Sequence, residues 1–313
     1  MLRYIVRRVL YAVPILVGVS LLTFVLFYAT ASPEQMARRN LPAKNPTQQQ
    51  IQEWLHEHGY DKPPAAQLKK HMSELFLLRF GKSDGTGEDI WGRIRAGAGP
   101  SALVAVVVFF GAVLVSVSAA LGVAYLRGTY VDYWGTFLCV LLMSVVYVVY
   151  IIAGQFLLGK VLKYAPLAGY QPGAGAWRFA LLPAAIGIVA GLGSRVRFYR
   201  TMMLEEMNQD YVRTARAKGV GERRILFRHV LKNASIPILT SVVLSIPFLF
   251  LGSLLLESFF AIPGLGTLTV DAINGQDFAT VRAMVFLGTI LYIIGAILTD
   301  ISYALVDPRV RLE

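Results

Sequence analysis

The chain has 313 residues, of which 56% are apolar, and its 30 basic and 19 acidic side chains give a formal net charge of +11. This composition excludes an ordinary soluble domain and predicts an integral membrane protein, because several apolar stretches reach the roughly 20 residues that a helix needs to cross a bilayer. The single cysteine, Cys139, excludes a disulfide framework and a cysteine metal site, and in a membrane protein the positive charge favours loops that face anionic lipid or a polar partner over nucleic acid.

The first predicted element is a membrane span from Val9 to Tyr28. Three arginines among the first eight residues place the N-terminus in the cytoplasm by the positive-inside rule. The run ends at Ala29-Thr30-Ala31, which imitates the cleavage site of a signal peptide, but it is longer than the apolar core of such a peptide. We therefore predict that residues 1–30 comprise an N-terminal tail and the first transmembrane helix.

Residues 31–99 form a long polar segment, which we predict to be an extracytoplasmic loop. Its ten basic residues do not oppose this placement, because the positive-inside rule counts only short loops. Within the segment, residues 47–58 predict a surface helix that is capped by Thr47, with Ile51 and Trp54 near one face.

Two patterns in this loop imitate functional sites. Gly81-Lys82-Ser83 looks like the end of a phosphate-binding loop, but Phe76 stands where its first glycine belongs and no apolar strand precedes it. His56 and His58 are two residues apart, so on a helix they point to different faces and do not match a zinc-binding pair. Neither pattern predicts nucleotide or metal binding.

Three apolar stretches follow the loop and predict the next three spans. A short cytoplasmic turn with Arg127 and Asp132 separates the first two, and a segment rich in glycine and proline separates the last two. Gly187 and Gly191 give the last stretch a GxxxG spacing, which favours close helix packing but is a weak signal on its own. The predicted spans are Ser101–Leu126, Tyr133–Leu158 and Trp177–Gly193.

A polar stretch, Arg195–Ser235, lies between spans four and five and carries ten basic and four acidic residues. We predict two short helices in it, Tyr211–Lys218 and Glu222–Asn233. Asp210 is suited to be the N-cap of the first helix, and Gly219 is suited to end it in a left-handed turn. This order predicts a compact helical hairpin, although the charge alone is explained by any cytoplasmic loop that obeys the positive-inside rule.

The last two predicted spans are Ile236–Phe260 and Ala283–Leu305. The first of them contains Pro237 and Pro247, so we expect local bends there. Six spans return the C-terminus to the cytoplasm. The predicted fold is therefore an all-α integral membrane protein with six transmembrane helices, a cytoplasmic loop between helices four and five, and a sizeable extracytoplasmic loop after helix one.

Glu257 and Asp300 are the acidic residues within or near the apolar spans. An ionisable residue in the membrane is a candidate functional group by default. Both lie near the predicted ends of their spans, however, where headgroups, water or a basic partner can satisfy them, so a structural role is favoured over a gating role. Arg282 on the outer side and the arginines of residues 195–235 on the inner side are the partners that we expect.

The residues of the polar stretch resemble a known family. Leu204-Glu205, followed by Asp210-Tyr211-Val212-Arg213-Thr214-Ala215-Arg216-Ala217-Lys218-Gly219, is similar to the coupling loop of ABC-importer permeases, in particular the dipeptide, oligopeptide and nickel permease family. Arg213-Thr214-Ala215 replaces the general Glu-Ala-Ala triplet, and His229-Val230-Leu231-Lys232 replaces Ile-x-Leu-Pro, as in the peptide branch.

Three further segments carry the same resemblance. Glu257 to Gly266 resembles the family pattern E-x-x-F-x-I-P-G-L-G. Asp277-Phe278 with Val281 resembles R-D-Y-P-x-V, with Gln276 where arginine is usual. The tail from Asp300 to Arg311 resembles D-x-x-Y-A-x-x-D-P-R-I-R, so that the likeness covers nearly the whole chain and is patchy only in residues 31–99.

The resemblance implies a non-catalytic permease subunit of an ATP-driven importer for peptides or a similar small solute, in the bacterial inner membrane. It divides the chain into residues 1–30, the external loop 31–99, and a permease core 100–313 with the coupling loop 195–235. The ATPase-coupling residues that it implies are Glu205, Asp210, Tyr211, Arg213, Thr214, Ala215, Arg216, Ala217, Lys218 and Gly219.

The same resemblance implies partners. They are a second homologous permease in a heterodimer, two cytoplasmic ATPase subunits, an extracytoplasmic solute-binding protein and the lipid bilayer. ATP would be bound by the ATPase subunits, so we expect no cofactor, metal or nucleic acid on this chain.

Other functions remain open at this point. The solute could be a nickel chelate, an opine or glutathione, since such permeases are similar. A membrane-embedded hydrolase with Glu257 and Asp300 as catalytic acids is disfavoured, because we predict the two residues on opposite sides of the membrane and a shared site needs them within hydrogen-bond reach. A passive channel or scaffold is disfavoured because it would have no need of a coupling hairpin.

Overall fold

The structure is a computed structural model that describes residues 2–30, 32–41, 45–173, 175–246 and 253–306. The regular elements in these ranges are helices, apart from one isolated bridge between Lys82 and Asp89. Pro247, and the tail residues 307–313 that resemble the family ending, lie outside the described residues. The all-α class expected from the sequence is confirmed.

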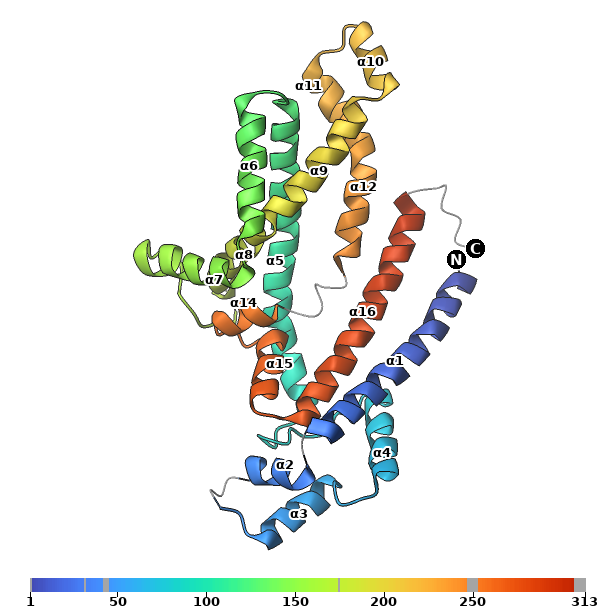
Figure 1. Ribbon diagram of the computed structural model, residues 1–313, viewed down its shortest axis with the longest axis vertical. Helices are drawn as coiled ribbons and strands as arrows, with labels where there is room; N and C mark the ends of the chain where they lie inside the picture. The colour runs from blue at the N-terminus through green and yellow to red at the C-terminus, as the bar shows by residue number, and fades with distance from the viewer. Residues whose placement is uncertain (1, 31, 42–44, 174, 247–252, 307–313) are drawn as a thin grey trace.

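The helices form an elongated bundle with different structures at its two ends (Figure 1). Helices α10 and α11 lie at one end, and α2, α3 and α4 lie at the other. The N-terminal end of α1 and the C-terminal end of α16 both point toward the end that carries α10.

Three straight helices are long and apolar enough to cross a membrane, and they match predicted spans one, two and six. Helix α5 starts eleven residues earlier than predicted, because Asp89 caps it by accepting the Gly92 amide at 2.8 Å and Ile90 and Ile94 pack inside. Helices α1 and α16 pack side by side and antiparallel. The three helices are α1 (Leu2–Thr30), α5 (Ile90–Tyr125) and α16 (Phe278–Val306).

Predicted span three is not one straight helix. It consists of α6 (Tyr130–Ser144) and α7 (Tyr147–Gly154), which continues in a π-helical turn to Val161, and the two parts meet at 97°. Val145 and Val146 between them have extended backbones, which suits β-branched residues. The Tyr150 hydroxyl donates to the Leu142 carbonyl at 2.6 Å, so a helix-end acceptor left by the bend is satisfied.

Predicted span four continues beyond Gly193. Helix α8 (Ala176–Ala190) turns by 50° at Gly191 and runs on as α9 (Leu192–Met207). Gly187 faces Val108 of α5, where a Cβ would be only 3.1 Å from the valine side chain. Of the GxxxG pair, Gly187 therefore serves close packing, whereas Gly191 marks the bend.

Predicted span five begins earlier than expected. The helix that starts as α11 (Glu222–Ile225) passes through a π-helical turn, Leu226–Val230, into α12 (Leu231–Leu244) without ending at Asn233. After the gap in the described residues come α14 (Leu254–Phe259) and α15 (Leu265–Asn274). With three straight and two bent candidate spans, the count of six remains a prediction.

The external loop of the prediction contains three short helices, α2 (Pro33–Asn40), α3 (Gln48–His58) and α4 (Pro64–Phe76). The cap at Thr47 is confirmed as a capping box, in which Thr47 accepts the Gln50 amide and the Gln50 side chain accepts the Thr47 amide. Ile51 and Trp54, which were predicted to lie near one face of this helix, are both buried.

Candidate functional site

The coupling residues predicted from the sequence lie together at one end of the molecule (Figure 1). Helix α10 runs from Asp210 to Ala217, and its N-cap is Gln209 rather than Asp210. The Asp210 carboxylate is instead 94% exposed in the first turn and pairs with Arg213 at 3.2 Å. Gly219 follows the helix with a φ of +76°, so the predicted left-handed turn is confirmed.

The apolar face of α10 is part of the core between the membrane helices. Val212 and Ala215 are buried in one cluster with Ala120 and Ala124 of α5 and Met203 of α9. Residues of α6, α11 and α12 belong to the same cluster. The hairpin of α10 and α11 is therefore a packed extension of the membrane helices and not a separate loop.

Polar contacts hold the hairpin to its neighbours. The Tyr211 hydroxyl donates to the Glu206 carboxylate at 2.5 Å, and burial together with this bond raises the pKa of Tyr211. Arg216 donates to both carboxylate oxygens of Glu222, at 2.7 and 3.2 Å, which joins α10 to α11 and lowers the pKa of Glu222. Because the ion pair between Arg216 and Glu222 is exposed, it contributes only about 0–1 kcal/mol to stability.

The remaining surface of the hairpin is available to a partner. Tyr211 is half-buried and Ala215 is buried, so they support the hairpin from inside. Exposed are Glu205, Asp210, Arg213, Thr214, Arg216, Ala217, Lys218 and Gly219. Their contact with an ATPase stays a prediction.

An ion pair that the sequence analysis missed fixes the neighbouring turn. Asp132 at the start of α6 receives two hydrogen bonds of 2.8 Å from the guanidinium of Arg200 in α9. The side chains are 8% and 22% exposed, so the pair is largely removed from water. Asp132 also accepts the Gly128 amide at 3.1 Å. The pair joins residues 68 positions apart, and no local pattern announces it.

Glu257 has a structural role in the family-like segment that contains it. Its side chain is fully buried, and its two oxygens accept the amides of Ser253 at 3.0 Å and Gly266 at 2.7 Å. A Cβ at Gly264 or Gly266 would collide with this carboxylate. The glycines of the pattern are therefore needed to let the backbone close on the glutamate.

The partners expected for the two membrane acids were wrong. Arg282 pairs with Glu74 at 3.3 Å and not with Glu257. Asp300 pairs at 2.9 Å with Arg8 of α1, and not with an arginine of residues 195–235. Glu257 and Asp300 thus have separate surroundings, so the structure does not assemble them into the catalytic pair of the hydrolase alternative.

The segment that imitates a phosphate-binding loop connects the external region to α16. Asp277 accepts the Asp84 amide at 3.0 Å and the Ser83 hydroxyl at 2.5 Å. Asp84 in turn accepts the Ala279 amide at 2.9 Å, and burial raises the pKa of its carboxyl group. Ser83 therefore has a structural bond inside the chain, and the segment around residue 83 is in direct contact with the family-like segment at Asp277.

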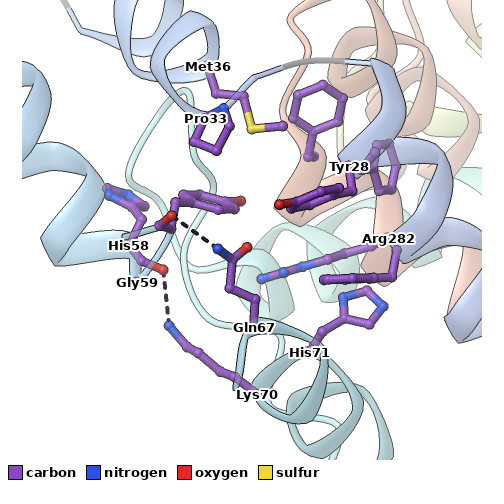
Figure 2. A pocket seen from close by; sticks show the side chains of 13 residues that line it. Tyr28, Pro33, Met36, His58, Gly59, Gln67, Lys70, His71 and Arg282 are labelled. Carbon is purple, nitrogen blue, oxygen red and sulfur yellow. Dashed lines mark hydrogen bonds between the residues drawn. The ribbon is translucent and has the colours of Figure 1, made fainter. Parts of the chain in front are cut away.

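A cavity of about 60 Å³ lies beside this junction, between α1, the external helices and α16 (Figure 2). In this view Tyr28, Gln67, His71 and Arg282 converge on it. His71 contacts the Ser20 carbonyl at 3.1 Å, and burial with the nearby Arg282 charge lowers its pKa to about 4. The cavity is too small for a peptide, so we interpret the region as a packed joint between α4, α1 and α16.

Two larger clefts adjoin each other at the level of the membrane helices. One, of about 330 Å³, lies between α5, α8 and α14, and the other, of about 220 Å³, lies between α5, α9 and α12. Both are lined by Phe109, Arg195 and Ser245. Within the described residues, no three His, Cys, Asp or Glu side chains come close enough together to bind a metal ion.

Comparison with known proteins identifies relatives along the whole chain. Residues 112–312 match the family model described as binding-protein-dependent transport system inner membrane component, and residues 1–88 match the model of its N-terminal part. The chain is 31% identical to the oligopeptide transport system permease protein AppB of Bacillus subtilis, over 99% of this chain and 100% of that protein. It is 34% identical to a protein of Brucella abortus named as a peptide transport system permease, over 99% of each chain.

Proposed function

Because the chain belongs to the family of binding-protein-dependent transport system inner membrane components, we propose that it is the membrane-spanning permease subunit of an ATP-driven importer of peptides. The names of its relatives in Bacillus subtilis and Brucella abortus support peptides as the solute class. Nickel chelates, opines and glutathione are the alternatives, and nothing in the clefts favours any of them over peptides.

The observation that carries the proposal is the continuous core between the hairpin and the membrane helices. Val212 and Ala215 of α10 belong to the same buried cluster as Ala120 and Ala124 of α5, so a force on the exposed face of α10 has a packed route to α5. Close packing of this kind transmits a displacement instead of absorbing it. An ATPase that closes against the hairpin would therefore move the spans, which is what alternating access requires.

We place the hairpin and both termini in the cytoplasm and residues 31–99 outside, in a bacterial inner membrane. The partners are a second permease of the same family, two ATPase subunits that bind and hydrolyse ATP, and an external solute-binding protein. In this arrangement residues 1–30 and the core 100–313 form this subunit's part of the pathway, and the region 195–235 transmits the ATPase movement. The chain itself catalyses no reaction.

The test is to express the chain together with candidate permease, ATPase and binding-protein genes from the same genome. We expect the ATPase subunits to copurify with it, and the reconstituted complex to accumulate peptides from a random tripeptide library in proteoliposomes that contain ATP. Uptake should stop without ATP or without the binding protein. A complex that assembles but accumulates nickel chelates, and no peptide, would contradict the peptide assignment.

A further inference from the structure

Arg195 lies deep in the membrane part of the protein. The sequence analysis placed it at the start of a cytoplasmic loop, but it belongs to the first turn of α9, just after the bend at Gly191. It lines the smaller cleft together with Phe109 and Val113 of α5. These residues are near the middle of predicted span two, so Arg195 is level with the centre of the membrane and not with its surface.

The guanidinium of Arg195 has an unused donor. Its Nη1 atom is buried and has no hydrogen-bond partner among the residues that the structure describes. Glu257 is the only carboxylate among the described residues that line the two clefts, and its oxygens already accept two backbone amides. Arg195 is half-buried among the membrane helices, and a buried donor that stays unbonded there is costly. This cost indicates that the guanidinium pairs with a ligand that is bound only part of the time.

The surroundings of Arg195 are built to receive a polar group. The guanidinium lies against Gly191, so closely that a Cβ there would displace it. Hydroxyl groups of Ser241, Ser245 and Tyr147 line the adjoining clefts, whose remaining walls are mostly apolar. The larger cleft has a volume of about 330 Å³, within the range of small-ligand pockets. A cation above a mostly apolar wall with scattered hydroxyls suits a small organic anion.

We propose that Arg195 binds the carboxylate of the transported solute on its way through the membrane. This inference rests on the proposed function, since a peptide with any side chains ends in a carboxylate. The planar guanidinium matches a carboxylate in a bidentate way. One such contact can hold many different peptides without choosing among their sequences, which leaves the choice of peptide to the binding protein.

The test compares two forms of one random tripeptide library, the free acids and the C-terminal amides. Binding to the purified, nucleotide-free complex in nanodiscs, without the binding protein, is measured by mass spectrometry of the retained peptides. We expect the wild-type complex to bind the acids at least about tenfold more tightly than the amides, as one charge-assisted hydrogen bond in a desolvated site predicts. Equal binding of acids and amides would overturn the proposal without any variant.

Single substitutions test which residue causes the preference for free acids. Arg195→Met should remove the preference for acids, and Arg195→Lys should keep part of it because the charge remains. Arg178→Met, which removes an exposed arginine at the outer end of the same bent span, is the matched control and should keep the full preference. A preference that survives in Arg195→Met would overturn the assignment of the carboxylate to Arg195.

Two further outcomes have defined meanings. If Arg195→Met separates the two permeases on gel filtration, Arg195 pairs with a carboxylate of the second permease and the proposal is wrong. Uptake of the acid library by the wild-type complex in proteoliposomes tests the proposed function independently. Uptake without an acid preference in binding would refute only the role of Arg195, whereas no uptake of any peptide would refute the peptide function itself.

Discussion

Substitution of Gly219 is the sharpest test of the coupling hairpin. Its φ of +76° lies in the left-handed region, where a side chain costs about 1–2 kcal/mol. A Cβ at this position would meet no atom of the described residues within 4 Å. Backbone strain is therefore the main internal cost of Gly219→Ala. We attribute a further loss in Gly219→Arg to a partner that occupies the space, provided that a matched arginine control shows no such loss.

Gly128, in the turn between α5 and α6, offers a matched control. Its φ is +77°, and in the described part of the chain nothing lies within 4 Å of where its Cβ would stand. Gly128→Arg therefore introduces the same strain and the same charge outside the predicted coupling residues. Both arginine variants should insert and fold nearly as well as the wild type, because neither change touches a membrane-spanning helix.

The assay is ATP hydrolysis by the reconstituted complex, with and without loaded binding protein, combined with copurification of the ATPase subunits. We expect Gly219→Ala to reduce stimulated hydrolysis in part, because about 1–2 kcal/mol of strain shifts the hairpin population. Gly219→Arg should weaken ATPase copurification and abolish stimulation, whereas Gly128→Arg should retain both. Normal coupled hydrolysis in Gly219→Arg, or an equal loss in Gly128→Arg, would refute the reasoning.

Three other predictions follow from the same structure. Asp132→Asn should lower the free energy of unfolding of the complex by about 3 kcal/mol, because it leaves a largely buried arginine of α9 unpaired. In the same unfolding measurement Asp210→Asn is the control and should cost less than about 1 kcal/mol, because the Asp210 side chain is 94% exposed. The pKa of His71 is about 4 in the folded protein and 6.5 when unperturbed, so its stabilising contribution is complete above pH 6.5 and is lost, by up to about 3 kcal/mol, as the pH falls toward 4. Hydrogen exchange in α4 should rise over this interval, and a His71→Gln variant that shows the same rise would contradict the assignment. For topology, we expect a cysteine at Gln49 to react with an impermeant thiol reagent added from outside, and a cysteine at Arg216 not to react. Both cysteines are introduced in a background without the native cysteine. Reversed labelling would contradict the proposed orientation.

Local sequence rules predicted the features that depend on neighbouring residues alone. The cap at Thr47 and the left-handed turn at Gly219 each require only a short pattern, and both are confirmed. The apolar lengths of the first, second and last spans were sufficient to identify α1, α5 and α16. The same local rules placed the N-cap of α10 one position too late, at Asp210 and not at Gln209, because both residues are compatible with a helix start.

Features that depend on packing between distant segments could not be predicted. An uninterrupted apolar run reads the same whether it forms one straight span or the 97° corner at Val145 and Val146. The basic character of residues 195–235 suggested a loop, although Arg195 stands in a helix against the middle of α5. The pair of Asp132 and Arg200 was also out of reach, since it arises only once α6 and α9 lie together.

The bend at Gly191 connects the position of Arg195 with the position of the hairpin. The guanidinium occupies the space beside Gly191, and α9 leads from there to α10. A change in the 50° angle between α8 and α9 must therefore move both. If an ATPase movement changes this bend and thereby weakens the binding of the solute at Arg195, bound solute opposes that movement by the same free energy. The reason is that the coupling between two binding sites is reciprocal. A solute that is held too tightly at Arg195 would slow its own import, so the useful affinity at this point has an upper limit.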